Sequence, residues 1–266
     1  MEIKRVVRLY FSPTHGTEKI VNAVADAVAA SEVLDLNRTS FDSRWSGAKL
    51  REGDFAIIGL PIYHGRVPRI MVEFFRSIEA KNVPAALVMS YGNRGVDDAL
   101  LEMKDICTEK GFLPVSAGAF VGQHSFTEKM GRGRPNTEDL KMATEFGAAS
   151  AELVRKAASV EDLKALSLEV PGAFPYRPAT DIPVAPSTDM DKCNGCMLCQ
   201  QECPVQAINP LDPSDIDGWR CLDCARCIQS CPQGAKALTF PALQEKITIM
   251  EAMFTAPKEN QLYYAK

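Results

Sequence analysis

The stretch KCNGCMLCQQECPVQA, residues 192–207, places four cysteines within eleven residues. The same spacing returns from Cys221 onward, and a proline follows the last cysteine of each run. The eight residues are Cys193, Cys196, Cys199, Cys203, Cys221, Cys224, Cys227 and Cys231. Eight of the nine cysteines of the chain therefore lie in one duplicated segment. In a reducing compartment, such clustering indicates metal binding rather than disulfides.

The spacing CxxCxxCxxxCP is typical of thiolates that hold [4Fe–4S] clusters. Over about fifty residues, the segment resembles the two-[4Fe–4S] ferredoxin family, in which the last cysteine of each run binds the other cluster. The resemblance implies one cluster on Cys193, Cys196, Cys199 and Cys231, and a second on Cys221, Cys224, Cys227 and Cys203. The alternative is structural zinc, which usually takes four ligands in two CxxC pairs and would leave a third cysteine of each run unused.

The part of the chain from residue 1 to residue 160 alternates the patterns of strands and helices. Apolar runs predict five strands, at residues 6–11, 33–36, 54–61, 83–90 and 113–121. Amphipathic helices separate them, and Asn136 is a good cap for the last one. This order predicts a doubly wound α/β fold with a five-stranded parallel sheet. The ninth cysteine, Cys107, shares a helical face with Leu100 and Met103, which predicts a buried and inert thiol.

A doubly wound sheet binds its ligand beyond the carboxyl ends of its strands. The loops that follow the strands there are SPTHGTEK (12–19), PIYHGRVP (61–68), SYGNRG (90–95) and GQHSF (122–126). Hydroxyl groups and a helix N-terminus make the first of these loops suitable for a phosphate. Tyr63 and Tyr91 are available to stack on a ring. The loops match neither a GxGxxG nor a Walker pattern.

The first loop carries the frame Ser-x-Thr-x-x-Thr, and the segment 1–160 resembles the flavodoxin family, whose loops bind FMN. This sequence departs from that family in having a histidine where a glycine usually follows the middle threonine. The resemblance implies an FMN site made of Ser12, Thr14, His15, Gly16, Thr17, Pro61, Ile62, Tyr63, His64, Gly65, Ser90, Tyr91, Gly92, Asn93 and Arg94.

All three histidines, His15, His64 and His124, fall in these loops. Two interpretations stay open: donors or a proton relay beside a flavin or substrate, or the ordinary polarity of loops. The loops lack the close histidine spacing of a metal site. The basic residues Arg66, Arg94 and Arg134 fit either a phosphate contact or plain solvation. Residues 122–136 are long enough to form a lid over a small substrate.

The order of these features predicts four parts. Residues 1–160 are a flavodoxin-like FMN-binding domain and 187–240 a small α+β ferredoxin-like domain with two [4Fe–4S] clusters. Residues 161–186 are rich in proline and form either an extended linker or a strap across the first domain. Residues 241–266 are a C-terminal helix and tail, and the amphipathic spacing of the helix favours docking on the protein itself.

The combination resembles fused flavodoxin–ferredoxin proteins, found mostly in anaerobes. That resemblance implies an electron-transfer protein that relays electrons between two [4Fe–4S] clusters and FMN, and on to redox protein partners. The alternative is a flavin-dependent reductase, an FMN-dependent oxidoreductase whose clusters supply electrons for a small-molecule acceptor. A third hypothesis is a module that keeps both folds but binds no flavin. The sequence leaves open whether the protein is an enzyme, and what its donor and acceptor are.

Composition narrows the setting. The formal net charge is −4, so a basic surface for nucleic acid is not expected. No stretch approaches the roughly 20 apolar residues of a membrane span. The first residues, MEIKRVVRLYF, read as a strand rather than a signal peptide. We therefore expect a cytoplasmic protein. Acidic residues outnumber basic ones between 187 and 240, which suits a basic redox partner or reflects an ordinary solvated surface.

Overall fold

The computed structural model describes residues 1–266 except 46, 48 and 180–182. Residues 180–182 of the expected linker thus lie outside the described residues. The strands of the large sheet are β1 (Arg5–Tyr10), β2 (Glu32–Asn37), β3 (Asp54–Pro61), β4 (Val83–Tyr91), β5 (Phe112–Val121) and β10 (Gln261–Tyr264). The helices around it are α1 (Gly16–Asp26), η1 (Asp42–Trp45, a 3₁₀ helix), α2 (Arg69–Arg76), α3 (Ala99–Glu109), α4 (Thr137–Lys156) and α5 (Val160–Ala165).

Five of the strands are parallel and stand in the order β2-β1-β3-β4-β5. This order is that of the flavodoxin-like doubly wound fold, which the alternating sequence pattern predicts. Residues of β1 show why both faces are covered: Val7 and Leu9 pack with α2 and α3, whereas Val6 and Tyr10 pack with α1 and α4. Cys107 is buried in the first of these two cores, as its helical spacing predicts.

The sheet has a sixth strand that the sequence pattern does not predict. β10 pairs antiparallel with β5, with Leu262 opposite Gly118. The expected five-stranded sheet is therefore extended at the edge that would otherwise leave β5 unpaired. Only four residues, QLYY, form this strand, and they lie far beyond β5 in the chain, so local pattern carries no information about their partner.

The segment after α5 lies against the first domain. Tyr176 donates a hydrogen bond to Asp105 of α3 (2.6 Å), and the N–H groups of Ala173 and Arg177 bind Asp98. Near the start of this strap, Ser167 exchanges two backbone hydrogen bonds with Lys266, at 2.9 and 3.1 Å. The start of the strap at Ser167 thus lies beside Lys266, in the segment that follows β10.

The second domain repeats itself in the backbone as it does in the cysteines. Its elements are β6 (Ser187–Thr188), α6 (Leu198–Gln201), β7 (Ile208–Asn209), β8 (Asp212–Ile216), α7 (Arg226–Gln229) and β9 (Lys236–Ala237), and α8 (Pro241–Phe254) follows. β6 pairs with β9, and β7 pairs with β8. The helices α6 and α7 begin after Met197 and Ala225, which share a left-handed conformation at φ 57° and 58°.

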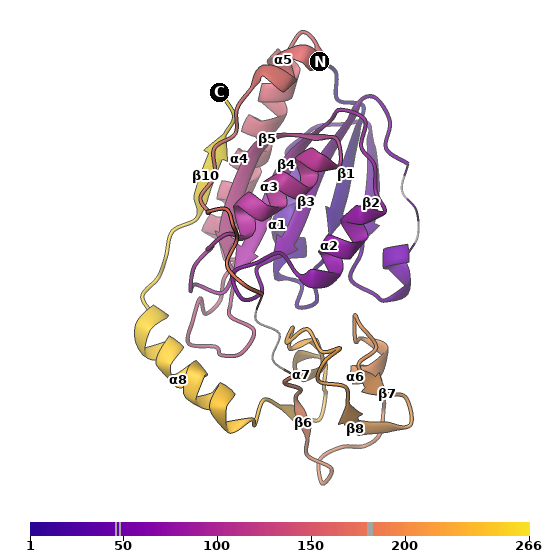
Figure 1. The fold of residues 1–266 in the computed structure, drawn as a ribbon, viewed down its shortest axis with the longest axis vertical. Helices are drawn as coiled ribbons and strands as arrows, with labels where there is room; N and C mark the ends of the chain where they lie inside the picture. Colours follow the sequence, from indigo (N-terminus) through magenta and orange to yellow (C-terminus); the bar gives the residue numbers. More distant parts are fainter. Residues whose placement is uncertain (46, 48, 180–182) are drawn as a thin grey trace.

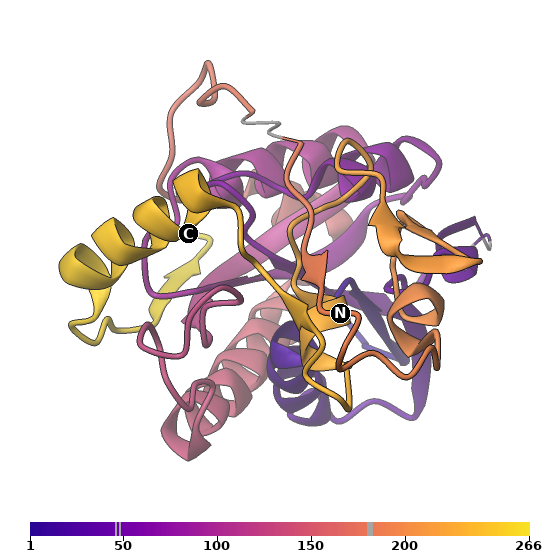
Figure 2. The same cartoon turned by 90° about the horizontal axis from the view of Figure 1, so that it is seen from below.

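The second domain faces one end of the large sheet. In Figure 1 it lies below the carboxyl ends of the parallel strands, with α8 beside it, and Figure 2 shows the same end from below. The loops that follow β1, β3, β4 and β5 therefore meet the second domain. This arrangement positions the candidate site.

Candidate functional site

A cavity of about 1100 Å³ lies where the loops after β1, β3, β4 and β5 meet the second domain. All four loops that the sequence singles out contribute to its lining. Of the residues expected to bind FMN, all except Ser12, His15 and Asn93 line the cavity. The structure therefore brings together most of the site that the flavodoxin resemblance implies.

The first loop has the geometry of an anion site. α1 begins at Gly16, so the N–H groups of Gly16 and Thr17 belong to its first turn and lack intrahelical partners. The Ser12 hydroxyl accepts a hydrogen bond from the N–H of Glu18 (3.0 Å). His15 adopts φ 60°, a left-handed conformation that costs a non-glycine residue roughly 1–2 kcal/mol. The loop thus keeps a turn that a glycine would adopt without that strain.

The unusual histidine of this loop contacts the second domain. Its Nε2 lies 2.6 Å from Nη1 of Arg226, and its Nδ1 lies 2.7 Å from a carboxylate oxygen of Glu18. Because arginine only donates, Nε2 of His15 accepts, and the proton resides on Nδ1. Arg226 also binds Glu202, which directly precedes Cys203. The expected phosphate loop is therefore tied to the cysteine runs.

The second loop makes another contact with the second domain. Backbone hydrogen bonds between Tyr63 and Arg66 close a tight turn, in which His64 adopts φ 53°. Nε2 of His64 lies 3.6 Å from a carboxylate oxygen of Asp223. Burial, followed by the nearby cysteines and Asp223, raises the pKa of Tyr63, so its hydroxyl stays neutral. Tyr63 can thus serve as an uncharged wall of the cavity.

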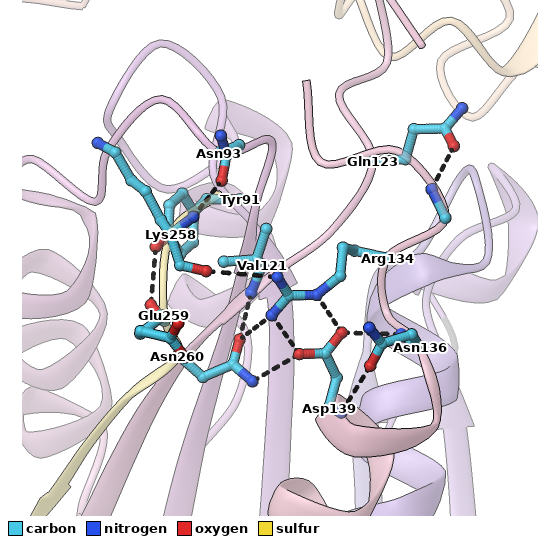
Figure 3. A network of polar contacts seen from close by, with 11 residues as sticks. Tyr91, Asn93, Val121, Gln123, Arg134, Asn136, Asp139, Lys258, Glu259 and Asn260 are labelled. Atoms are coloured by element: carbon cyan, nitrogen blue, oxygen red, sulfur yellow. Dashed lines mark hydrogen bonds and ion pairs between the residues drawn. The ribbon is translucent and has the colours of Figure 1, made fainter. Parts of the chain in front are cut away.

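The third loop forms hydrogen bonds with the C-terminal segment (Figure 3). Asn93 is fully buried, and its amide donates to the carbonyls of Phe254 (2.6 Å) and Ala256 (2.8 Å). Its Oδ1 accepts from the N–H of Lys258 at 3.0 Å. The Tyr91 hydroxyl donates to the carbonyl of Glu259. The Asn93 side chain thus holds the chain terminus, and a flavin contact of this residue stays a prediction.

An ion pair between Arg134 and Asp139 fixes the same segment (Figure 3). Asp139 also accepts from the N–H of Asn136 and from the amide of Asn260, both at 2.8 Å, and Asn260 accepts from the N–H of Val121 at 2.8 Å. Burial opposes the ionisation of Asp139, but Arg134 and the other donors outweigh it and lower its pKa.

The arginines that the sequence singles out are all paired within the protein. Arg66 forms an ion pair with Glu102 (2.6 Å), Arg94 with Asp97, and Arg134 with Asp139. Arg94 and Arg134 nevertheless line the cavity. Plain solvation therefore does not describe these side chains, and a phosphate or flavin contact of Arg94 or Arg134 stays a prediction.

The fourth loop brings a third histidine to the cavity. Nδ1 of His124 accepts a hydrogen bond from the N–H of Phe126 (3.1 Å), which leaves the proton of the neutral ring on Nε2. Burial, and then the charges of Arg94 and His64, lower the pKa of His124 to about 4. The ring is therefore neutral at physiological pH and acts as a hydrogen-bond donor rather than a cation.

This lowered pKa has a consequence for stability. Unfolded histidine takes up a proton near pH 6.5, whereas the folded His124 does so only near pH 4, so the unfolded state binds more protons between these values. We expect stability to fall as the pH drops from about 6.5 to 4, by up to about 3 kcal/mol from this group. His124→Gln should flatten this part of the profile, measured by urea unfolding of both proteins. Identical slopes would contradict the assignment.

A helix that the sequence does not assign to the site forms another wall of the cavity. Ala242, Glu245, Lys246, Ile249 and Met250 of α8 line it, at the spacing of one helical face. Ile247 and Met250 pack on Met130, which follows the fourth loop, whereas the Ile249 side chain remains 53% exposed. The expected docking of this helix on the protein is observed. The sequence pattern does not reveal the cavity face, because this face mixes apolar residues with Glu245 and Lys246.

The cysteines separate into two sets. Cys193, Cys196, Cys199 and Cys231, here called the distal set, together line a space of about 20 Å³. The other four, Cys203, Cys221, Cys224 and Cys227, are called the proximal set. Cys203 acts on the ionisation of the other three, and Cys227 is also affected by Cys199 of the distal set. In both sets the fourth cysteine accepts from a backbone N–H: Cys203 from Ala207 and Cys231 from Ala235, each at 3.3 Å. The grouping is the one that crossed ligation requires.

Both sets can supply thiolates to a cluster. Burial, the largest cause, raises the pKa of Cys221 to about 12 and that of Cys227 to about 11. Such thiols ionise when metal binds them. Among the described residues, no three His, Cys, Asp or Glu side chains converge on a single-ion site. A cube of four irons is ligated from around its outside, which suits sulfurs held apart.

The proximal set adjoins the large cavity. Leu222 and Asp223, between Cys221 and Cys224, line it. Cys224 belongs to the same apolar core as β3 and β4, and Cys203 and Cys221 pack against that core. Arg69 of α2 donates to the carbonyl of Cys221 at 3.1 Å. The distal set shares none of these contacts within the described residues, and Cys196 is exposed.

Comparison with known proteins supports the assignment of the second domain as an iron–sulfur domain. The family model of the 4Fe-4S dicluster domain matches residues 192–235. An uncharacterized protein of Methanocaldococcus jannaschii is 39% identical over 54 residues, which are 20% of this chain and 20% of that protein. The match thus spans about one fifth of the relative's length.

Solved structures similar to this chain cover its first part. A flavodoxin from the domain Archaea has a TM-score of 0.42 and 16% identity, over 57% of this chain and 99% of that one. Oxidised flavodoxin 1 from Bacillus cereus has a TM-score of 0.42 and 16% identity, over 58% and 100% of the two chains. None of the described helices is long and apolar enough to cross a membrane. The strand order and the match to the dicluster model together show a chain that joins a flavodoxin-like α/β domain to a ferredoxin-like domain of the 4Fe-4S dicluster type.

Proposed function

We propose that this protein transfers electrons between two [4Fe–4S] clusters and an FMN, and exchanges them with redox protein partners in the cytoplasm. The observation that carries the proposal is the loop Cys221–Cys224, which both belongs to the proximal set and lines the cavity assigned to FMN. A flavin accepts two electrons and releases them singly or as a hydride, whereas a cluster passes one at a time. All nine cysteines are free of disulfides, as suits a reducing compartment.

The residues of the cavity suit FMN. The first turn of α1 offers N–H groups to the phosphate, and Tyr63 and Ile62 offer apolar surface to the ring. The fifteen residues named from the sequence remain our proposed FMN site, with Asn93 acting through the C-terminal segment that it holds. The two crossed sets of cysteines are our proposed cluster ligands.

The positions of the two sets suggest an order. The proximal set packs on the flavodoxin-like domain, so we assign it to exchange with the flavin. The exposed Cys196 belongs to the distal set, which we assign to exchange with the outside partner. A fixed intramolecular contact gives such a transfer an effective concentration in the millimolar range or above. The domain boundaries at 160, 186 and 240 belong to this proposal.

The cavity favours a second candidate, reduction of a small molecule at the flavin. Its volume of about 1100 Å³ reaches beyond the roughly 300–1,000 Å³ of ordinary ligand pockets, so it has room for FMN and another ligand. α8 and the second domain wall it on two sides, which restricts access by a protein acceptor. Reoxidation of the reduced protein by small electrophiles in single turnover would favour this candidate, and reoxidation by protein acceptors alone would favour the first.

Anaerobic purification tests both candidates. We expect a brown protein with about eight iron atoms and one FMN for each chain. A colourless protein that binds zinc instead of iron would contradict the cluster assignment. A protein that contains iron but binds no flavin, even after incubation with FMN, would contradict electron transfer between the clusters and FMN.

The contact between Arg226 and His15 gives a further prediction. Arg226→Ala removes a cation next to the proposed phosphate loop, and a charge-assisted contact of this kind contributes about 1.5–3 kcal/mol. We expect FMN to bind roughly tenfold or more weakly, whereas riboflavin, which lacks the phosphate, binds equally to both proteins. Fluorescence titration measures both affinities, and Arg132→Ala, at an exposed site, is the matched control. Equal losses for both flavins would show that Arg226 acts on the ring or on folding.

A further inference from the structure

The two cysteine runs differ at one buried position. Superposing the runs on Cys203 and Cys231 aligns Ala207 with Ala235, and both alanines donate their N–H to the fourth cysteine of their run at 3.3 Å. The next residue is Ile208 in the first run and Lys236 in the second. Both are buried, with 3% and 4% of their surface exposed. The second run thus carries a charged side chain at the position where the first run carries an apolar one.

Lys236 lies beside the distal set. It lines the same small space as Cys193, Cys196, Cys199 and Cys231. Its ammonium donates to the Thr188 hydroxyl (2.6 Å) and to the carbonyl of Pro213. Among the described residues, no carboxylate lies within ion-pair distance of it. A buried ammonium needs a counter-charge. The four thiolates that line the same space are candidates, and the charges of Asp212 and Cys227 also interact with that of Lys236.

The proximal set has a buried cation from the other domain. Arg44 of η1 is 4% exposed, and its guanidinium donates to the carbonyl of Pro204, directly after Cys203. The charges of Arg44 and Cys203 act on each other. Arg69 also reaches this set through the Cys221 carbonyl, but on a more exposed side. Arg226 is paired with Glu202. Arg44 forms no ion pair with a described carboxylate at ion-pair distance, and the charges that act on it are those of Cys203 and Glu73.

Resting on the proposed function, we propose that Lys236 and Arg44 are the buried counter-cations of the distal and the proximal cluster, and that each raises the reduction potential of its own cluster. A thiolate-ligated cluster becomes more negative on reduction, so a fixed positive charge in a low-dielectric site stabilises the reduced form. The distal potential is then set within the ferredoxin-like domain. The proximal potential depends on contact with the flavodoxin-like domain, which supplies Arg44.

Redox titration of the reconstituted full chain, followed by electron paramagnetic resonance, tests this assignment. Cys231→Ala and Cys203→Ala first identify which signal belongs to which cluster. We expect Lys236→Met to lower the reduced fraction of the distal cluster at least tenfold at a given potential, a shift of about 59 mV for one electron. The proximal signal should move less, because Lys236 lines the space of the distal set and interacts with only Cys227 of the proximal set. Arg44→Met should do the reverse, and Lys236→Arg should restore the distal potential.

Further variants separate charge from packing. Lys236→Gln keeps a donor for Thr188 and Pro213 without the charge, so it should lower the distal potential as Lys236→Met does, even if the latter fails to assemble. Ile208→Met, at the sister position, is the matched control and should move neither potential. Unchanged potentials in Lys236→Gln, or equal shifts of both clusters, would overturn the inference. A wild-type chain without clusters would overturn the proposed function instead.

Discussion

Cys203→Ala is expected to reduce the iron content from about eight atoms to about four and to block reduction of the flavin through the distal cluster. Cys203 lies in the first cysteine run, yet it groups with Cys221, Cys224 and Cys227 of the second. Its loss should therefore damage the cluster next to the FMN cavity. The distal cluster would remain but would lie beyond the reach of an intramolecular transfer.

Cys231→Ala is the matched variant, because it removes the corresponding cysteine of the second run. It should also leave about four iron atoms, but of the proximal cluster. Stopped-flow reduction of the flavin should then stay intramolecular, and only the partner protein that supplies electrons to the distal cluster should lose its effect. If Cys203→Ala instead spoiled the cluster of Cys193, Cys196 and Cys199, crossed ligation would be wrong.

Arg134→Ala should destabilise the protein by about 3–5 kcal/mol, because it leaves the buried Asp139 carboxylate without its cation. The same change should loosen the C-terminal segment, since Asn260 and Lys258 both bind this pair. Urea unfolding measures the first effect. Hydrogen exchange of residues 255–266 measures the second, in the full chain below its unfolding transition.

The pH dependence of Arg134→Ala checks the physical cause. The pKa of Asp139 is lowered in the folded protein, so its contribution to stability is present above the pKa of an unfolded carboxylate, about 4, and is lost as the pH falls through the folded value. The gap between wild type and variant should therefore narrow in acid. Arg132→Ala, in the same loop but exposed, should change neither stability nor exchange. A gap that is constant from pH 7 to pH 3 would point to packing alone.

The fold and much of the candidate site follow from short-range patterns. The apolar runs 54–61 and 83–90 predict β3 and β4 because strands covered on both faces need no alternation. The resemblance of the cysteine runs to two-cluster ferredoxins implies the crossed grouping of the two sets. Twelve of the fifteen residues expected at the FMN site line one cavity because the carboxyl ends of parallel strands lie together.

The remainder depends on contacts between distant residues. Asn93 resembles a flavin ligand in its loop, but its amide binds carbonyls of Phe254 and Ala256, near the other end of the chain. His15 departs from the flavodoxin pattern, and its partner Arg226 lies in the other domain. α8 lines the cavity with a face on which apolar residues alternate with Glu245 and Lys246, so its pattern does not point to a ligand site. The local sequence does not reveal such pairings, because each of these polar side chains could equally well be exposed to solvent.

The two hydrogen bonds between Ser167 and Lys266 change how the ferredoxin-like unit should be regarded. The segments that precede and follow this unit pair with each other, so it is inserted into the flavodoxin-like domain rather than attached to it by one linker. The segments on both sides of it bind the flavodoxin-like domain, one through the contact of Tyr176 with α3 and the other through the pairing of β10 with β5. Two attachment points restrict the motion of this unit more than a single tether would, so we expect redox partners to bind it where it stands. Because the two connecting segments pair at Ser167 and Lys266, another electron-transfer domain could be inserted between the same two attachment points.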